Sequence, residues 1–174
     1  AAMALAAFAA STASATDLYS TGVKVPVGAS LHATLEAGST MVFSTTDGSS
    51  IVNTCTASTV EGEVDSTGGA NVTSAIDALT WGPTCSVTTD TLTNGKLHID
   101  RDGTVRSTIS VITLNIGISC RYGTGGGTDV GTLNTGKLAI NAVIKEQEPK
   151  AFLCPDTIKW VANYRFTSPH DLTA

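Results

Sequence analysis

Hydrophobic and polar residues alternate along most of the chain after residue 16, and the last such segment shows the pattern most clearly. Over residues 158–166, every second residue is apolar and its neighbours are mostly polar. Alternation with a period of two is typical of half-buried β-strands. The face expected to point into the core consists of Ile158, Trp160, Ala162, Tyr164 and Phe166. Leu31, Ala33 and Leu35 form a shorter example, and residues 71–81 are also predicted to be a strand.

Turn sequences separate these segments at short intervals. Asp47-Gly48, Asn94-Gly95 and Thr135-Gly136 each stand between two predicted strands and indicate hairpins. Asp102-Gly103 turns into a long strand over residues 104–121, with one face formed by Leu114, Ile116, Ile118 and Cys120. About ten short strands at hairpin spacing indicate a β-sandwich or a barrel-like sheet. We predict an all-β, antiparallel sandwich, Ig-like or jelly-roll-like, forming one domain over residues 16–174.

The first residues differ in character from the rest of the chain. Residues 1–10 are apolar and mostly small, and Ala13-Ser14-Ala15 has the form of a small-residue cleavage site. Residues 1–15 are therefore predicted to be the remnant of a secretory signal peptide, removed to leave a chain that begins at Thr16. This predicts a secreted, periplasmic or cell-surface protein.

The composition limits the classes of partner. Charged residues are 14% of the chain and the net charge is −5, which is unfavourable for binding phosphate backbones. No nucleic-acid partner is therefore expected. No stretch reaches the ~20 apolar residues that a membrane helix needs, so no membrane span is expected.

Four cysteines, Cys55, Cys85, Cys120 and Cys154, are expected to form two disulfides in an exported chain. Four cysteines allow three pairings. Their positions beside turns and strand ends favour the sequential pairing, Cys55–Cys85 and Cys120–Cys154. A zinc or redox site would need C-x-x-C or Cys/His spacing, which the sequence lacks.

Signatures of catalysis and of cofactor binding are missing from the sequence. The histidines, His32, His98 and His170, show no metal-ligand spacing, and no G-x-S-x-G elbow occurs. The glycine-rich residues 123–127 lack the Lys-Ser/Thr of a phosphate loop. We predict no enzymatic activity, no catalytic residues, no metal and no cofactor. Among the aromatic residues, Trp81 and Tyr122 are the candidates for contact with a ligand.

Several segments of this sequence resemble a group of small exported proteins of proteobacteria and actinobacteria that are largely uncharacterised. The segments are VNTCT (52–56), LTWGPTC (79–85), SCRYGTG (119–125), FLCP (152–155), KWVANY (159–164) and TSP (167–169). The resemblance implies export and an all-β domain with disulfides. It implies no activity, cofactor or catalytic residue.

Three functions were weighed. The first is a non-enzymatic structural or adhesive protein, whose partners would be further copies of itself, in an oligomer or filament, or cell-surface components. The second is a module that binds a glycan or a small apolar ligand. The third is a hydrolase whose site assembles only in space. Exposed apolar patches would favour the first, a deep pocket lined by Trp81 or Tyr122 the second, and clustered His, Asp and Ser the third. We expect the first.

Overall fold

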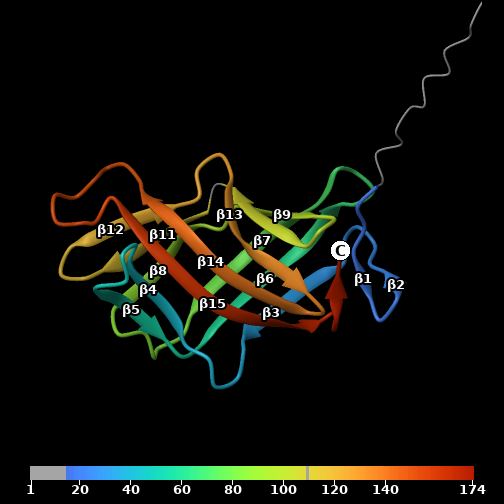
Figure 1. The fold of residues 1–174 in the computed structure, drawn as a ribbon, viewed down its shortest axis with the longest axis horizontal. Helices are drawn as coiled ribbons and strands as arrows, with labels where there is room; N and C mark the ends of the chain where they lie inside the picture. Colours follow the sequence, from blue (N-terminus) through green and yellow to red (C-terminus); the bar gives the residue numbers. More distant parts are fainter. Residues whose placement is uncertain (1–14, 109) are drawn as a thin grey trace, which may run out of the picture.

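The computed structural model describes residues 15–108 and 110–174, and every regular element in them is a β-strand (Figure 1). The strands are β1 (Tyr19–Ser20), β2 (Val23–Lys24), β3 (Ser30–Leu35), β4 (Met41–Thr45), β5 (Ile51–Cys55), β6 (Ser58–Ser66), β7 (Asn71–Trp81), β8 (Thr88–Thr93), β9 (Lys96–Asp100), β10 (Thr104–Thr108), β11 (Val111–Asn115), β12 (Ser119–Gly123), β13 (Thr128–Asn134), β14 (Lys137–Glu146), β15 (Thr157–Ser168) and β16 (Leu172–Thr173). The predicted signal remnant, residues 1–15, lies outside the described residues except for Ala15. A helix long and apolar enough to cross a membrane is not found in the described part of the chain.

Eight of these strands form a closed antiparallel barrel. Their order is β15-β3-β6-β7-β9-β10-β13-β14, and β14 pairs with β15 along nine residue pairs to complete the ring. The prediction of an all-β, antiparallel fold is confirmed, but the expected sandwich is replaced by this barrel. A period of two shows only that one face of a strand is buried, which holds for both architectures. The barrel differs from the sandwich in that β14 pairs with β15 and closes the ring. The alternation of apolar and polar residues does not show which strands pair with each other.

Five further strands extend the barrel at one end. β4 pairs with the first half of β15, where Trp160 faces Phe43, and β5 continues from β4. β12 pairs with the end of β14, and β11 and β8 follow it. The opposite end carries the small sheet β16-β1-β2. In Figure 1, β12 and β2 therefore lie at opposite ends of the long axis.

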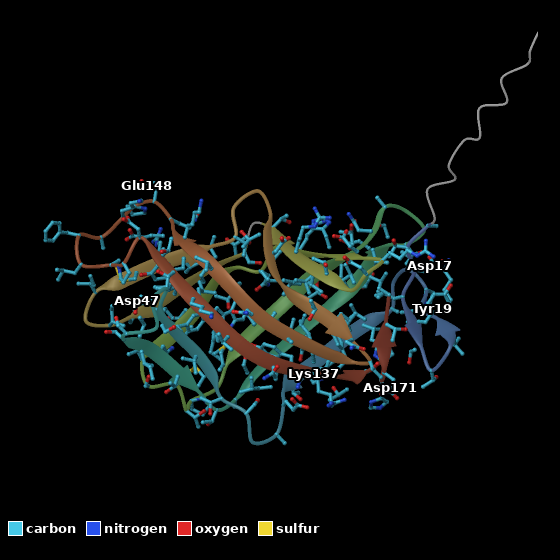
Figure 2. The ribbon with its side chains drawn as sticks, in the orientation of Figure 1. Asp17, Tyr19, Asp47, Lys137, Glu148 and Asp171 are labelled. Carbon is cyan, nitrogen blue, oxygen red and sulfur yellow. A yellow bond between two sulfur atoms is a disulfide. The ribbon has the colours of Figure 1, made fainter. Side chains whose placement is uncertain are left out.

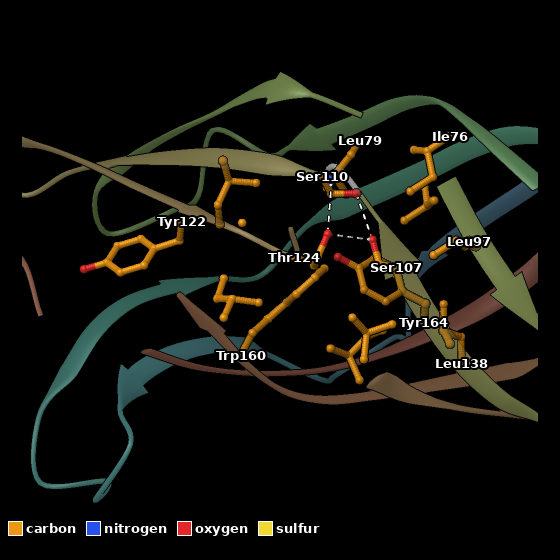
Figure 3. Close-up of a pocket in the computed structure, with 16 residues that line it drawn as sticks. Ile76, Leu79, Leu97, Ser107, Ser110, Tyr122, Thr124, Leu138, Trp160 and Tyr164 are labelled. Atoms are coloured by element: carbon orange, nitrogen blue, oxygen red, sulfur yellow. Dashed lines mark hydrogen bonds between the residues drawn. The ribbon is translucent and has the colours of Figure 1, made fainter. Parts of the chain in front are cut away.

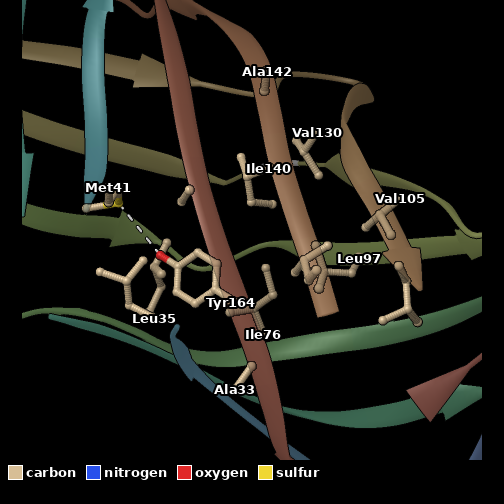
Figure 4. Close-up of a cluster of buried hydrophobic side chains, with 14 of the residues drawn as sticks. Ala33, Leu35, Met41, Ile76, Leu97, Val105, Val130, Ile140, Ala142 and Tyr164 are labelled. Atoms are coloured by element: carbon tan, nitrogen blue, oxygen red, sulfur yellow. Dashed lines mark hydrogen bonds between the residues drawn. The ribbon is translucent and has the colours of Figure 1, made fainter. Parts of the chain in front are cut away.

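The core follows the predicted alternation in β15. Ile158, Ala162, Tyr164 and Phe166 are buried, and Trp160 is partly buried and packs against the same cluster. Figure 4 shows Tyr164 beside Leu35 and Met41, with its hydroxyl directed to the Met41 sulfur at 3.7 Å. The predicted core face of this strand is confirmed.

One predicted hairpin is wrong. Asn94-Gly95 joins β8 to β9, but β8 pairs with β11, whereas β9 pairs with β7 and β10. The turn instead bonds to distant segments, because Asn94 accepts a hydrogen bond from the Ser110 hydroxyl at 2.6 Å. Gly95 has φ +75°, and a Cβ there would lie 2.2 Å from the Thr108 carbonyl oxygen. Glycine at this position allows the turn to lie close to residues 108–110, and it does not join two strands that pair with each other.

The expected long strand over residues 104–121 is three strands, β10, β11 and β12. Leu114 and Cys120 face each other across the β11–β12 pair and are fully buried. Ile116 is exposed, because it stands in the turn around Gly117, where φ is +94°. The other three turns, Asp47-Gly48, Asp102-Gly103 and Thr135-Gly136, lie in hairpins as predicted.

Candidate functional site

The two disulfides follow the predicted pairing. Cys55–Cys85 connects the end of β5 to the loop before β8, and Cys120–Cys154 connects β12 to the loop between β14 and β15. Cys55 and Cys120 are fully buried. Both bonds therefore fasten a loop to the extended end of the barrel.

Trp81, a candidate for ligand contact, lies in an aromatic cluster with Phe43 and Trp160. The three ring centroids are 5.8–6.1 Å apart, within the range of favourable aromatic pairs. The Trp81 indole N–H donates a hydrogen bond to the Thr91 hydroxyl at 2.8 Å. Its ring is partly buried, and its polar group already has a partner. This environment is that of a packing residue.

Tyr122, the other candidate, is fully buried in β12. Its hydroxyl donates a hydrogen bond to the Pro155 carbonyl oxygen at 3.1 Å. Burial raises the pKa of Tyr122 to about 12, and the nearby Glu146 and Asp156 carboxylates add to the effect. The side chain connects β12 to the loop that follows β14.

A narrow cavity lies inside the barrel beside Tyr122 (Figure 3). Its volume is about 40 Å³, measured as the space open to the centre of a water molecule. Aliphatic and aromatic side chains form most of its wall, including those of Trp160 and Tyr164. Three hydroxyls, of Ser107, Ser110 and Thr124, bond to one another or to backbone at one place in that wall. Pockets for small molecules are usually roughly 300–1,000 Å³, so this is a gap in a filled barrel rather than a ready-made ligand site.

Among residues 15–108 and 110–174, the most exposed large apolar side chains lie outside the barrel, in residues 147–156 between β14 and β15. Phe152 is 100% exposed and Leu153 is 70% exposed. We call these two residues the apolar tip. A single exposed apolar residue is ordinary, but two adjacent large ones with no cover are a candidate contact surface.

The loop behind the apolar tip is firmly attached. Besides the Cys120–Cys154 disulfide, the Gln147 N–H donates to the Arg121 carbonyl at 2.8 Å, and the Glu146 N–H donates to the Asp156 carbonyl at 2.9 Å. The buried Glu146 carboxylate accepts a hydrogen bond from the Ala151 N–H at 2.9 Å. These bonds hold both ends of the loop and the residue before Phe152.

Phe152 and Leu153 were not among the contact residues predicted from the sequence. Their signal was present: two large apolar residues stand between Pro149 and Cys154-Pro155, in a segment without strand alternation. Such a pair cannot lie on one face of a strand, so it is either folded inward or exposed.

The histidines are dispersed. His32 bonds to the Thr167 hydroxyl, His98 lies between Thr73 and Thr108, and His170 is exposed near β16. In residues 15–108 and 110–174, no group of three or more His, Cys, Asp or Glu side chains could hold a metal ion. The three histidines therefore stand at separate places in the described fold.

The chain was compared with family models, curated proteins and solved structures. None of them matches. The resemblance to exported bacterial proteins stays a prediction.

Proposed function

We propose that this protein is a non-enzymatic structural or adhesive component of the extracellular space or the cell surface, and that it acts through the apolar tip. The observation that carries the proposal is the exposure of Phe152 and Leu153 on a loop fastened by a disulfide. Large apolar side chains that are exposed next to each other are typical of surfaces that contact another protein or a membrane.

The attachment of the loop supports a contact role. A mobile loop loses conformational entropy when it binds, whereas a loop already held at its ends loses less. The bonds around Glu146 and Gln147 and the Cys120–Cys154 disulfide supply this order in advance. Two disulfides also fit an oxidising compartment, in which a secreted, periplasmic or cell-surface protein would work.

The alternative is a module that binds a glycan or a small apolar ligand. The cavity beside Tyr122 favours it, since its wall is mostly apolar. Its volume of about 40 Å³ holds about three water molecules by the usual measure, far less than a sugar or a lipid chain needs. Trp81 and Tyr122 are also turned to internal partners. The apolar tip therefore has the stronger support.

Adsorption measurements test the proposal. We expect the purified protein to bind a surface coated with alkyl chains more strongly than one coated with hydroxyl groups. Phe152→Ser should weaken binding to the alkyl surface by at least about ten-fold, because a buried Phe contributes roughly 1.5–3 kcal/mol. Val143→Thr is the matched control, since Val143 is 48% exposed on β14 and outside the loop. Equal binding by the wild type and Phe152→Ser would refute the role of the apolar tip.

A further inference from the structure

A second concentration of exposed apolar residues lies at the end of the molecule opposite the apolar tip. Tyr19, Val23 and Val27 are all exposed around the β1–β2 hairpin. Figure 2 shows Tyr19 and Asp171 at one end of the long axis and Glu148, in the loop of the apolar tip, at the other. The molecule thus has apolar surface at both of its ends.

The second concentration borders an open groove. The groove has a volume of about 400 Å³ and lies between the β1–β2 hairpin and the end of β15. Half of its lining is apolar, and the other half consists of Lys24 and four hydroxyl residues. The apolar lining residues are Val23, which is 69% exposed, Val25, Pro26, Ala29 and Pro169. This volume is in the range of sites that take small apolar groups. We call it the hairpin groove.

The charges near the two ends are complementary. Residues 119–125 and 143–161, around the apolar tip, carry four basic and three acidic side chains, and one of the acidic ones, Glu146, is buried. Within this set, Lys150 is paired with Asp156 at 3.3 Å. Around the hairpin groove, Lys24 is already paired with Asp17 at 2.8 Å, while Glu63 faces Ser30 across the β3–β6 pair and Asp171 is exposed. Apart from these two ion pairs, Arg121, Lys145 and Lys159 outnumber the exposed Glu148 at the tip end, whereas Glu63 and Asp171 remain near the groove, so the small net charges of the two ends are opposite in sign.

We propose that the apolar tip of one copy of this chain docks in the hairpin groove of the next copy. The inference rests on the proposed function, because it names what the tip contacts. A lipid surface would explain the exposure of Phe152 but not the groove, the exposed Val23 or the charge difference between the ends. A second copy accounts for all of these.

The position of the two surfaces determines the form of the assembly. A contact between different surfaces on opposite ends of a molecule does not close in a pair, and it continues into an open chain unless the rotation closes a ring. An oligomer of any length keeps one free tip at one end and one free groove at the other, so further copies can add to it. The expected product is a head-to-tail series of oligomers that lengthens with protein concentration.

Sedimentation velocity of the full chain over a range of concentrations tests this. The wild type should form a concentration-dependent series of oligomers. Phe152→Ser alters the tip and Val23→Lys alters the groove, and each should raise the apparent dissociation constant at least about ten-fold. Val143→Thr, on β14 and outside the loop of the apolar tip, leaves the charge unchanged; it is the control and should assemble like the wild type. A wild type that is monomeric at every concentration would overturn the docking.

A mixture of the two variants makes the test specific. The Phe152→Ser chain keeps its groove and the Val23→Lys chain keeps its tip, so an equimolar mixture should form a pair of one copy of each and nothing longer. If the tip instead met another tip, Val23→Lys would form dimers by itself and the mixture would gain nothing, which would overturn the proposal. The proposal would also be overturned if Phe152→Ser lost binding to lipid vesicles while its self-association stayed unchanged.

The outcomes separate this inference from the proposed function. A protein that adheres through Phe152 but stays monomeric keeps the function and refutes the docking. A protein that assembles through Phe152, while its adsorption to alkyl surfaces is unaffected by Phe152→Ser, keeps the docking and refutes the adhesive role.

Discussion

Removing the Cys120–Cys154 disulfide should lower the free energy of unfolding by about 4 kcal/mol. The bond joins residues 34 positions apart. In the chain-entropy description, closing a loop of this length restricts the unfolded chain by about 3.8 kcal/mol at 25 °C. Cys120 is also fully buried, so replacing it with alanine adds a small packing loss. Since a domain is usually stable by about 5–15 kcal/mol, the change is a large part of the total.

The assay is urea unfolding of Cys120→Ala/Cys154→Ala, followed by circular dichroism, beside a Cys55→Ala/Cys85→Ala control. The control removes a bond across 30 positions, for which the same description gives about 3.6 kcal/mol. The two double variants should therefore lose similar stability. Their m-values should both rise, because an uncrosslinked unfolded chain exposes more surface.

The two variants should differ in self-association, which we expect to weaken only when the loop of the apolar tip is released from β12. A loss of stability below about 1 kcal/mol with an unchanged m-value would refute the entropic reasoning. Equal loss of self-association in both variants would refute the specific role assigned to the loop.

Three other predictions concern the barrel. Trp160→Ala should lower the urea midpoint by the equivalent of about 3–5 kcal/mol, because it removes a ring packed against the aromatic cluster. Burial raises the pKa of Tyr122 from 10.0 to about 12, so its contribution to the free energy of unfolding is complete below pH 10 and is lost as the pH rises from 10 to 12. In Tyr122→Phe, the free energy of unfolding should therefore fall less over that range, as measured by urea unfolding at each pH. Gly131→Ala should destabilise the barrel strongly by thermal melting, because a Cβ there would lie 1.9 Å from the Ala139 carbonyl oxygen, whereas Gly126→Ala meets no atom within 4 Å and should be close to neutral.

Local signals in the sequence were sufficient for most strands and most turns, although the segment 104–121 was predicted as one strand and is three. The face of β15 from Ile158 to Phe166 and the hairpin at Asp47-Gly48 depend on residues close in sequence, and both were predicted. The disulfide pairing was also predicted, because each bond joins segments about 30 residues apart with turns between them.

Features that depend on distant segments were not predictable in the same way. The turn at Asn94-Gly95 carries hairpin residues, yet its bonds go to Ser110 and to Ile76 rather than across a hairpin. Closure of the barrel depends on which strands meet, and Phe152 became a candidate contact residue only when its exposure was known. In each case, the deciding interaction joins residues that no periodic pattern relates.

The position of β15 in the barrel has a consequence for how the chain folds. This strand pairs with β14, which comes just before it, and also with β3 and β4 near the other end of the described chain; His32 and Thr167 are 135 positions apart. Until β15 has been synthesised, β3 and β14 each expose an unpaired edge. Contacts between residues this far apart in sequence slow folding, because the chain loses conformational entropy in bringing them together before the stabilising contacts form. The barrel therefore stays open until β15 is present, and its closure is expected to be a late step in the folding of this domain.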